Sequence, residues 1–163
     1  MELKQTVRIS MLLALSVVLS IIESFFPIFS GSIPGVKIGL ANIVIVTVLY
    51  LYTFKEAFTV SVLRIVLVGI LRTGLFGTTF LFSLFGAIFS LLFMIIAKKT
   101  KKLSIIGVSI FGSYIHTLAQ IILAIFLLKN VNIIYYLPFL GVISVITGII
   151  TGFLSKEIIK IVK

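Results

Sequence analysis

The residues that could do chemistry are few, and most of them are isolated along the chain. The sequence holds four carboxylates and one histidine, and it has no cysteine. A single histidine cannot form a zinc site without partners, and disulfides are excluded. Glu23, Arg64 and His116 each fall inside a long apolar stretch. Their placement predicts a polar binding site rather than a set of separate surface charges.

Catalysis is a weaker interpretation of the same residues. Magnesium-dependent chemistry on a diphosphate normally needs clustered carboxylates, whereas the acidic residues here are widely spaced. The sequence also has no Gly-x-x-x-x-Gly-Lys-Ser/Thr loop for ATP, and no serine or histidine constellation for nucleophilic attack. We therefore expect no enzyme activity, no metal and no cofactor. The carboxylates are Glu2, Glu23, Glu56 and Glu157.

The elements that position these residues must lie in a membrane. Apolar residues make up 61% of the 163 residues and charged residues only 11%, against about a quarter charged in soluble domains. The apolar stretches are continuous, without the two-residue alternation of barrel strands, so they predict α-helices. At roughly 20 residues per span, residues 1–163 form a single all-α transmembrane domain with six helices. The expected spans are 6–26, 38–52, 57–71, 79–97, 103–128 and 133–154.

The distribution of basic residues predicts the orientation. Ten of them fall on the side of the N-terminus and three in the opposite loops, while Arg64 lies within a span. Because cytoplasmic loops are enriched in Lys and Arg, both termini are expected in the cytoplasm. A net charge of +10 then reflects contact with anionic membrane lipids, and nucleic acid is not an expected partner. The ten are Lys4, Arg8, Lys55, Lys98, Lys99, Lys101, Lys102, Lys156, Lys160 and Lys163; the three are Lys37, Arg72 and Lys129.

Polar residues gather in the outer half of the predicted bundle. A helix rises about 1.5 Å per residue, which places Arg64 near mid-depth and most other polar residues above it. An ionisable group at the membrane centre costs at least about 2.5 kcal/mol, so Glu23 needs a partner, for which Arg64, Arg72 and Lys37 are candidates. The pattern favours a ligand pocket open to the outside. Its candidate residues are Glu23, Lys37, Asn42, Arg64, Arg72, His116, Gln120 and Tyr136.

A purely structural role for these polar residues is an alternative to a ligand pocket. Glu23 and Arg64 could form only a structural ion pair, and Arg72 and Lys37 could anchor helices at the interface. His116 and Gln120, one turn apart, could hold helices together by hydrogen bonds.

Small residues recur at helical spacing and predict close helix contacts. Ser144, Gly148 and Gly152 form one such stripe, for which internal packing is expected. Ser10 and Ala14 lie at the cytoplasmic end of the first span, where they could instead meet a partner protein.

Several short segments spread over nearly the whole chain carry a family resemblance. They are 34–42, Leu63-Arg64, 82–86 with Ser90, 116–120, 136–138, Thr147-Gly148 and Thr151-Gly152. The most specific is the first, with the pattern Pro-Gly-x-Lys-x-Gly-x-Ala-Asn. Together these segments resemble the Gx transporter family, whose members are often labelled heptaprenyl diphosphate synthase component I. The chain departs from the family pattern at Phe85, Thr117 and Ala119.

This family is similar to the substrate-binding S components of energy-coupling-factor transporters. The resemblance implies a six-helix fold in a bacterial cell membrane, an outward-facing site for a small solute, and docking on a coupling subunit with two ATPases. Three cations against one carboxylate favour an anionic or zwitterionic solute. The alternative is a non-catalytic membrane component of a heptaprenyl diphosphate synthase or a quinone or redox system.

Overall fold

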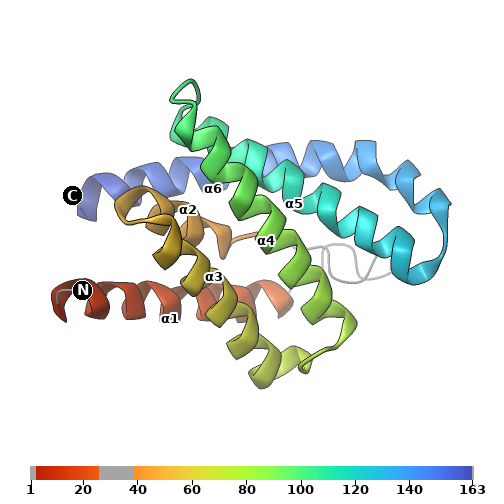
Figure 1. Ribbon diagram of the computed structural model, residues 1–163, viewed down its shortest axis with the longest axis horizontal. Helices are drawn as coiled ribbons and strands as arrows, with labels where there is room; N and C mark the ends of the chain where they lie inside the picture. Colours follow the sequence, from red (N-terminus) through yellow and green to blue (C-terminus); the bar gives the residue numbers. More distant parts are fainter. Residues whose placement is uncertain (1–2, 26–38, 163) are drawn as a thin grey trace.

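The computed structural model describes residues 3–25 and 39–162, and every regular element in these ranges is a helix (Figure 1). The predicted all-α fold is therefore confirmed for the described residues. The helices are α1 Leu3–Phe25, α2 Asn42–Leu51, α3 Phe54–Val68, α4 Thr78–Lys99, α5 Ile105–Leu128 and α6 Leu137–Val162, with a π-helix at Gly69–Thr73 and a 3₁₀-helix at Val131–Tyr136.

Four of these segments are long and apolar enough to cross a membrane: Leu3–Phe25, Thr78–Lys99, Ile105–Leu128 and Val131–Val162. The chain is thus membrane-embedded. α2 is also apolar but has only 10 residues, which span about 15 Å, half of the hydrocarbon core of about 30 Å. The six-span count and the orientation remain predictions.

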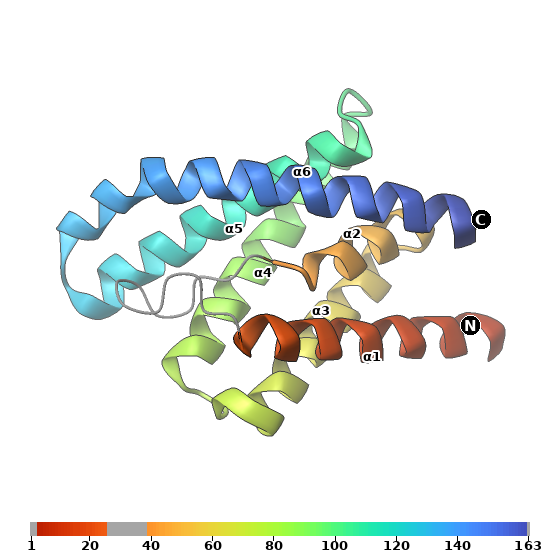
Figure 2. The ribbon, with the colours of Figure 1, turned by 180° about the vertical axis from the view of Figure 1, so that it is seen from behind.

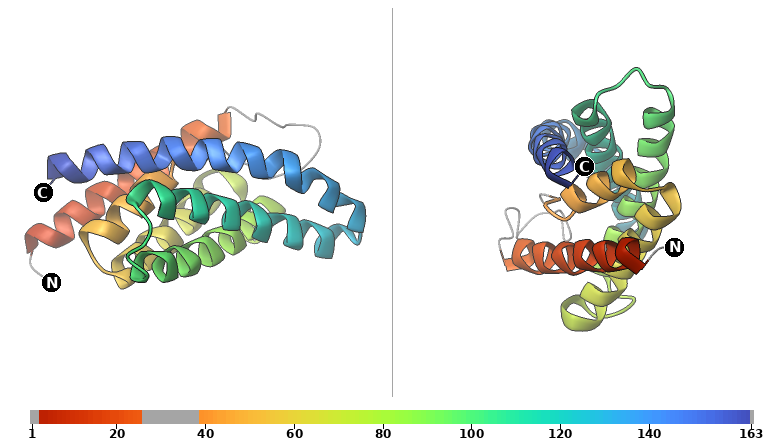
Figure 3. Two further views of the ribbon diagram at one scale, coloured as in Figure 1. Left: turned by 90° about the horizontal axis from the view of Figure 1, so that it is seen from above. Right: turned by 90° about the vertical axis from the view of Figure 1, so that its left-hand side faces the viewer.

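Both ends of the described chain lie at the same end of the bundle (Figure 3). The α2–α3 corner and the α4–α5 loop lie toward this end too. This arrangement agrees with an even number of membrane crossings and brings the lysine-rich segments together.

Two predicted spans, the second and the sixth, differ from the helices by four residues or more at one end or both. The second was expected to start at residue 38, but α2 begins only at Asn42, because Gly39 adopts a left-handed φ of 87° and its carbonyl closes a turn with the Asn42 N–H at 2.8 Å. The sixth was expected to end at residue 154, but α6 continues to Val162. Its last part stays packed against the bundle, where Ser155 and Ile159 are buried.

α2 forms the centre of the bundle. Its residues from Ile43 to Leu49 are all buried, and it lies between α6 and α1 (Figure 2). The Ser155 hydroxyl of α6 donates to the Ile43 carbonyl at 2.9 Å. At the other end of α2, Lys98 Nζ donates to the Leu49 carbonyl at 2.5 Å. A cation at a helix C-terminus complements the helix dipole, so Lys98 stabilises the C-terminal end of this buried helix.

Glycines bring α5 and α6 into contact along their length. A Cβ atom on Gly148 would lie 2.6 Å from Ile110 Cα, and one on Gly152 would lie 2.8 Å from Ile106 Cα. Beside them, the hydroxyls of Ser109 and Thr151 are 2.8 Å apart. The expected internal packing of this small-residue stripe is confirmed.

The start of α3 carries a capping box that depends on pH. The Glu56 carboxylate accepts hydrogen bonds from the Thr53 hydroxyl and from the Thr53 N–H, the latter at 3.1 Å. The hydrogen bond from the Thr53 side chain lowers the pKa of Glu56. Because the pKa of Glu56 is lower in the folded state, its ionised carboxylate stabilises the fold above the usual pKa of glutamate. This stabilisation is lost as the pH falls through the pKa of Glu56 in the folded protein.

We therefore expect Glu56→Gln to be less stable than the wild type at neutral pH, and we expect this difference to shrink as the pH falls below the usual pKa of glutamate, about 4.3. Chemical unfolding in detergent micelles at several pH values would measure this difference. Glu157→Gln, which alters a solvent-exposed pair with Lys160, is the matched control. A pH-independent difference for Glu56→Gln would contradict the capping role.

Candidate solute-binding chamber

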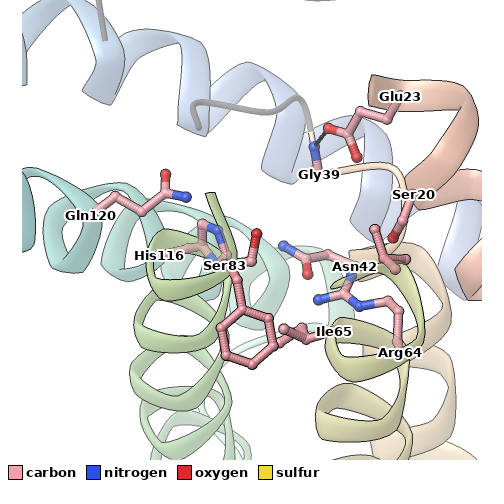
Figure 4. A pocket seen from close by; sticks show the side chains of 11 residues that line it. Ser20, Glu23, Gly39, Asn42, Arg64, Ile65, Ser83, His116 and Gln120 are labelled. Carbon is pink, nitrogen blue, oxygen red and sulfur yellow. Dashed lines mark hydrogen bonds between the residues drawn. The ribbon is translucent and has the colours of Figure 1, made fainter. Parts of the chain in front are cut away.

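A polar chamber lies within the bundle, between α1, α2, α3, α4 and α5 (Figure 4). Most of its lining side chains can form hydrogen bonds, although the helices that supply them are mostly apolar. Its volume is about 40 Å³, enough for a few water molecules. The lining residues are Ser20, Glu23, Gly39, Asn42, Arg64, Ile65, Val68, Phe80, Ser83, His116 and Gln120.

Glu23 supplies the carboxylate of the chamber. It lies near the end of α1 and is only 4% exposed. Its side chain accepts a hydrogen bond from the Gly39 N–H, just before α2 begins. Ser20, one turn earlier on the same face of α1, lines the chamber beside it. The carboxylate thus links the end of α1 to the turn that starts α2.

Arg64 supplies the positive charge. It is 6% exposed, comes from the middle of α3 and lines the same chamber as Glu23. Figure 4 shows its guanidinium extending toward Asn42, the first residue of α2. A buried arginine needs both an opposite charge and hydrogen-bond acceptors, and the chamber offers both.

His116, Gln120 and Ser83 form the opposite wall. His116 and Gln120 lie one turn apart on α5, and Ser83 lies on α4. A glycine permits this arrangement, since a Cβ atom on Gly86 would lie 2.7 Å from two atoms of the His116 ring. Gly86 therefore lets the imidazole lie directly against the backbone of α4.

Gly86→Ala is accordingly expected to displace the imidazole and reshape this wall of the chamber. The ring must move by several tenths of an ångström, at a cost of about 1–2 kcal/mol. Unfolding measurements would give the cost, and the ¹³C–¹H spectrum of selectively labelled His116 would report the displacement. Gly107→Ala, where the nearest atom is 3.4 Å away, is the control; an unchanged His116 spectrum in Gly86→Ala would contradict the contact.

Five of the predicted ligand residues meet in this chamber, namely Glu23, Asn42, Arg64, His116 and Gln120. Two others lie outside its lining. Arg72 is exposed, donates to the Ser24 carbonyl at 3.3 Å and lies 3.8 Å from the centre of the Phe25 ring. Tyr136 is exposed in the 3₁₀-helix, and Lys37 lies outside the described residues.

The candidate list omitted the remaining lining residues. Ser83 falls within segment 82–86, which resembles the family, but it was not predicted to bind a ligand, and neither was Ser20. The sequence did hold a signal for Ser20, because it lies three residues before Glu23 and so shares its helix face. The apolar members Ile65, Val68 and Phe80 carry no distinguishing sequence signal.

Together, the fold and the chamber define an all-helical membrane protein with a charged and hydrogen-bonding site inside its bundle. The sequence model of one family, described as heptaprenyl diphosphate synthase component I, matches residues 12–158. The chain belongs to this family, as its resembling segments indicated. Comparison with curated proteins and with solved structures finds no match.

Proposed function

We propose that this protein is the substrate-binding membrane subunit of an energy-coupling-factor-like transporter in a bacterial cell membrane. It takes up a small solute from the outer side and relies on partner ATPases for energy. The buried chamber carries this proposal. Five helices direct polar groups into one small volume, and Glu23 and Arg64 are both more than nine-tenths buried there.

The energetic argument favours a site over simple helix contacts. Polar side chains between membrane helices contribute only about 0.6 kcal/mol each on average, whereas a buried charge costs several kcal/mol before it is compensated. Packing alone would be served better by apolar side chains. A concave site with a few convergent polar groups is the usual form of a ligand pocket. The chamber holds a few water molecules, so a larger solute must separate its walls on binding.

The side of α1 that faces away from the bundle offers a surface on which a partner protein could dock. Ser10 and Ala14 are both exposed and lie one turn apart, which leaves a strip of small side chains where another helix can approach closely. A coupling subunit that recruits two ATPases fits this strip. The chain itself has no phosphate-binding loop, so the energy for release must come from a partner.

A second candidate function is a non-catalytic membrane component of a heptaprenyl diphosphate synthase or of a quinone or redox system. The description of the matching family favours it. In this case also the chain would act by binding. Glu56 caps α3 and Glu157 pairs with Lys160, so among the described residues Glu23 is the one carboxylate that lines the chamber. The two functions differ in their partners.

Purification of the tagged protein from native membranes, with mass spectrometry of bound proteins and small molecules, tests the proposal. We expect a coupling protein, two ATPases and a retained solute. Co-purification of a soluble prenyl diphosphate synthase without ATPases would support the second function and contradict the first.

Paired variants separate the site from the docking face. His116→Ala with Gln120→Ala should lose the solute but keep the partner proteins. Ser10→Leu with Ala14→Leu should lose the partners but keep the solute. Thr59→Leu, which also places leucine at an exposed helix position, is the control for the second pair and should change neither.

A further inference from the structure

We propose that a groove between α4 and α5 binds one chain of an anionic phospholipid, whose headgroup lies at the lysines of the loop that joins these two helices. This lipid site is distinct from the solute chamber, and it does not rest on the proposed function. The groove is lined by Phe85, Phe89 and Phe93 of α4 and by residues of α5 between Ile115 and Ile122. Its volume is about 260 Å³.

The groove has a small residue at its floor and aromatic side chains along one wall. Ala119 is the smallest of the lining side chains and is only 8% exposed, whereas the three phenylalanines are exposed. The rings of Phe85 and Phe89 stack with their centroids 5.9 Å apart, and the ring of Phe93 packs on that of Phe111 at 6.2 Å. Contacts within the protein therefore hold the aromatic wall in place.

The groove opens on the side of α4 that faces away from the chamber. At about 100° per residue, Phe85 and Phe89 lie on the face of α4 opposite to Ser83, which lines the chamber. α4 and α5 pack side by side (Figure 1), and both are long and apolar enough to cross the membrane. The groove therefore faces the bilayer.

The depth of the groove limits what can occupy it. Phe89 lies near the midpoint of α4, and the groove residues of α5 lie near the midpoint of that helix. At this depth a membrane offers hydrocarbon, so the occupant is a lipid chain or a helix of another protein.

The side chains of the groove favour a lipid chain over a helix. Close contact between membrane helices needs small side chains, whereas the exposed rim of the groove consists of phenylalanines and Ile122. A cavity of about 150 Å³ holds a benzene molecule. By the same ratio, the 260 Å³ of the groove holds about ten carbon atoms of a chain.

The lysines at one end of the groove indicate the headgroup. Lys99, Lys101 and Lys102 are exposed where α4 ends and the loop leads to α5. Along α4, Lys99 lies ten residues from Phe89, a rise of about 15 Å, which is half of the hydrocarbon core. A lipid of the nearer leaflet can thus place its headgroup at the lysines and its chain along Phe93 and Phe89. Lysines at the membrane surface favour an anionic headgroup.

Chain and headgroup contribute to binding in different ways. A chain that moves from the bilayer into the groove gains no hydrophobic free energy, because lipid tails are as apolar as the lining. Its preference for the groove must come from van der Waals contacts with the preformed wall. The preference for one lipid class comes from the lysines, so the two contributions can be removed separately.

Lipid binding to the purified protein tests the site. Phosphatidylglycerol and phosphatidylcholine with identical chains serve as the anionic and the zwitterionic probe, and native mass spectrometry from detergent micelles counts the bound lipids. We expect one phosphatidylglycerol per chain, bound at least about fivefold more tightly than phosphatidylcholine. Equal affinity for the two lipids would overturn the headgroup assignment and with it the proposal.

Variants of the groove and of the loop remove the two contributions one at a time. Ala119→Leu fills the floor of the groove and should weaken the binding of both lipids by at least about fivefold. Ile122→Trp, which covers the groove from its exposed rim, is the second filling variant if Ala119→Leu does not fold. Lys101→Gln with Lys102→Gln should lower the affinity for phosphatidylglycerol to that for phosphatidylcholine.

Matched controls make the same kinds of change away from the site. Thr59→Leu adds a leucine at an exposed position of α3, and Lys55→Gln with Lys156→Gln removes two exposed lysines outside the α4–α5 loop. Neither control should change lipid binding. Unchanged lipid binding in a folded Ala119→Leu or Ile122→Trp protein, or no binding of either lipid, overturns the inference. A partner protein that is lost in Ala119→Leu while lipid binding persists would assign the groove to a helix instead.

Discussion

Replacing Arg64 with methionine is expected to lower the free energy of unfolding by up to about 3–5 kcal/mol, because the buried Glu23 carboxylate then loses the positive charge that Arg64 places in the same chamber. Methionine keeps most of the length and apolar volume of the arginine stem, so the loss reports the charge rather than a cavity. Unfolding in mixed detergent micelles, followed by circular dichroism, measures the change.

The companion variants decide whether charge is the cause. Adding Glu23→Gln to Arg64→Met should restore much of the lost stability, because the double variant no longer buries a single charge. Arg72→Met is the matched control: this arginine is exposed, and its contacts are worth about 1 kcal/mol or less. A double variant that is as unstable as Arg64→Met alone would show that Arg64 acts through packing.

Gly148→Val is expected to destabilise the contact between α5 and α6 by about 3 kcal/mol. The Cβ atom of the new side chain alone would lie 2.6 Å from the Ile110 Cα atom and 3.2 Å from the Ile110 backbone nitrogen. A backbone cannot move aside as the end of a flexible side chain can, so the two helices must separate. The same unfolding measurement gives the cost.

Gly107→Val provides the control, because Gly107 has only ordinary contacts, the nearest at 3.4 Å. Valine is also no worse than glycine in a helix, so little change is expected there. Equal stability of Gly148→Val and the wild type would mean that α5 and α6 do not pack as closely as this structure has them.

The membrane class, the helical fold and the core of the chamber were predictable from the sequence. Long apolar stretches leave few alternatives in a bilayer, and the cost of burying charge makes the depth of Glu23, Arg64 and His116 informative. Depth along a helix follows directly from residue number, which is why five of the ligand candidates converge.

The direction in which a side chain points around its helix axis was harder to predict than its depth. Arg64 and Arg72 lie on one continuous helical segment, but a π-helix at Gly69–Thr73 changes the number of residues per turn between them. No sequence pattern indicated this change, and Arg72 consequently turns toward Ser24 and Phe25. The short length of α2 was missed for a similar reason, since only the backbone shows that Gly39 is left-handed.

The central position of α2 also constrains the order in which the protein assembles. α6, whose Ser155 binds the Ile43 carbonyl, leaves the ribosome long after α2. Until then, this 10-residue helix packs only against α1 and α3, and the flank that α6 later covers stays open. Synthesis that stops before α6 should therefore leave an insertion intermediate that membrane quality control can recognise and degrade.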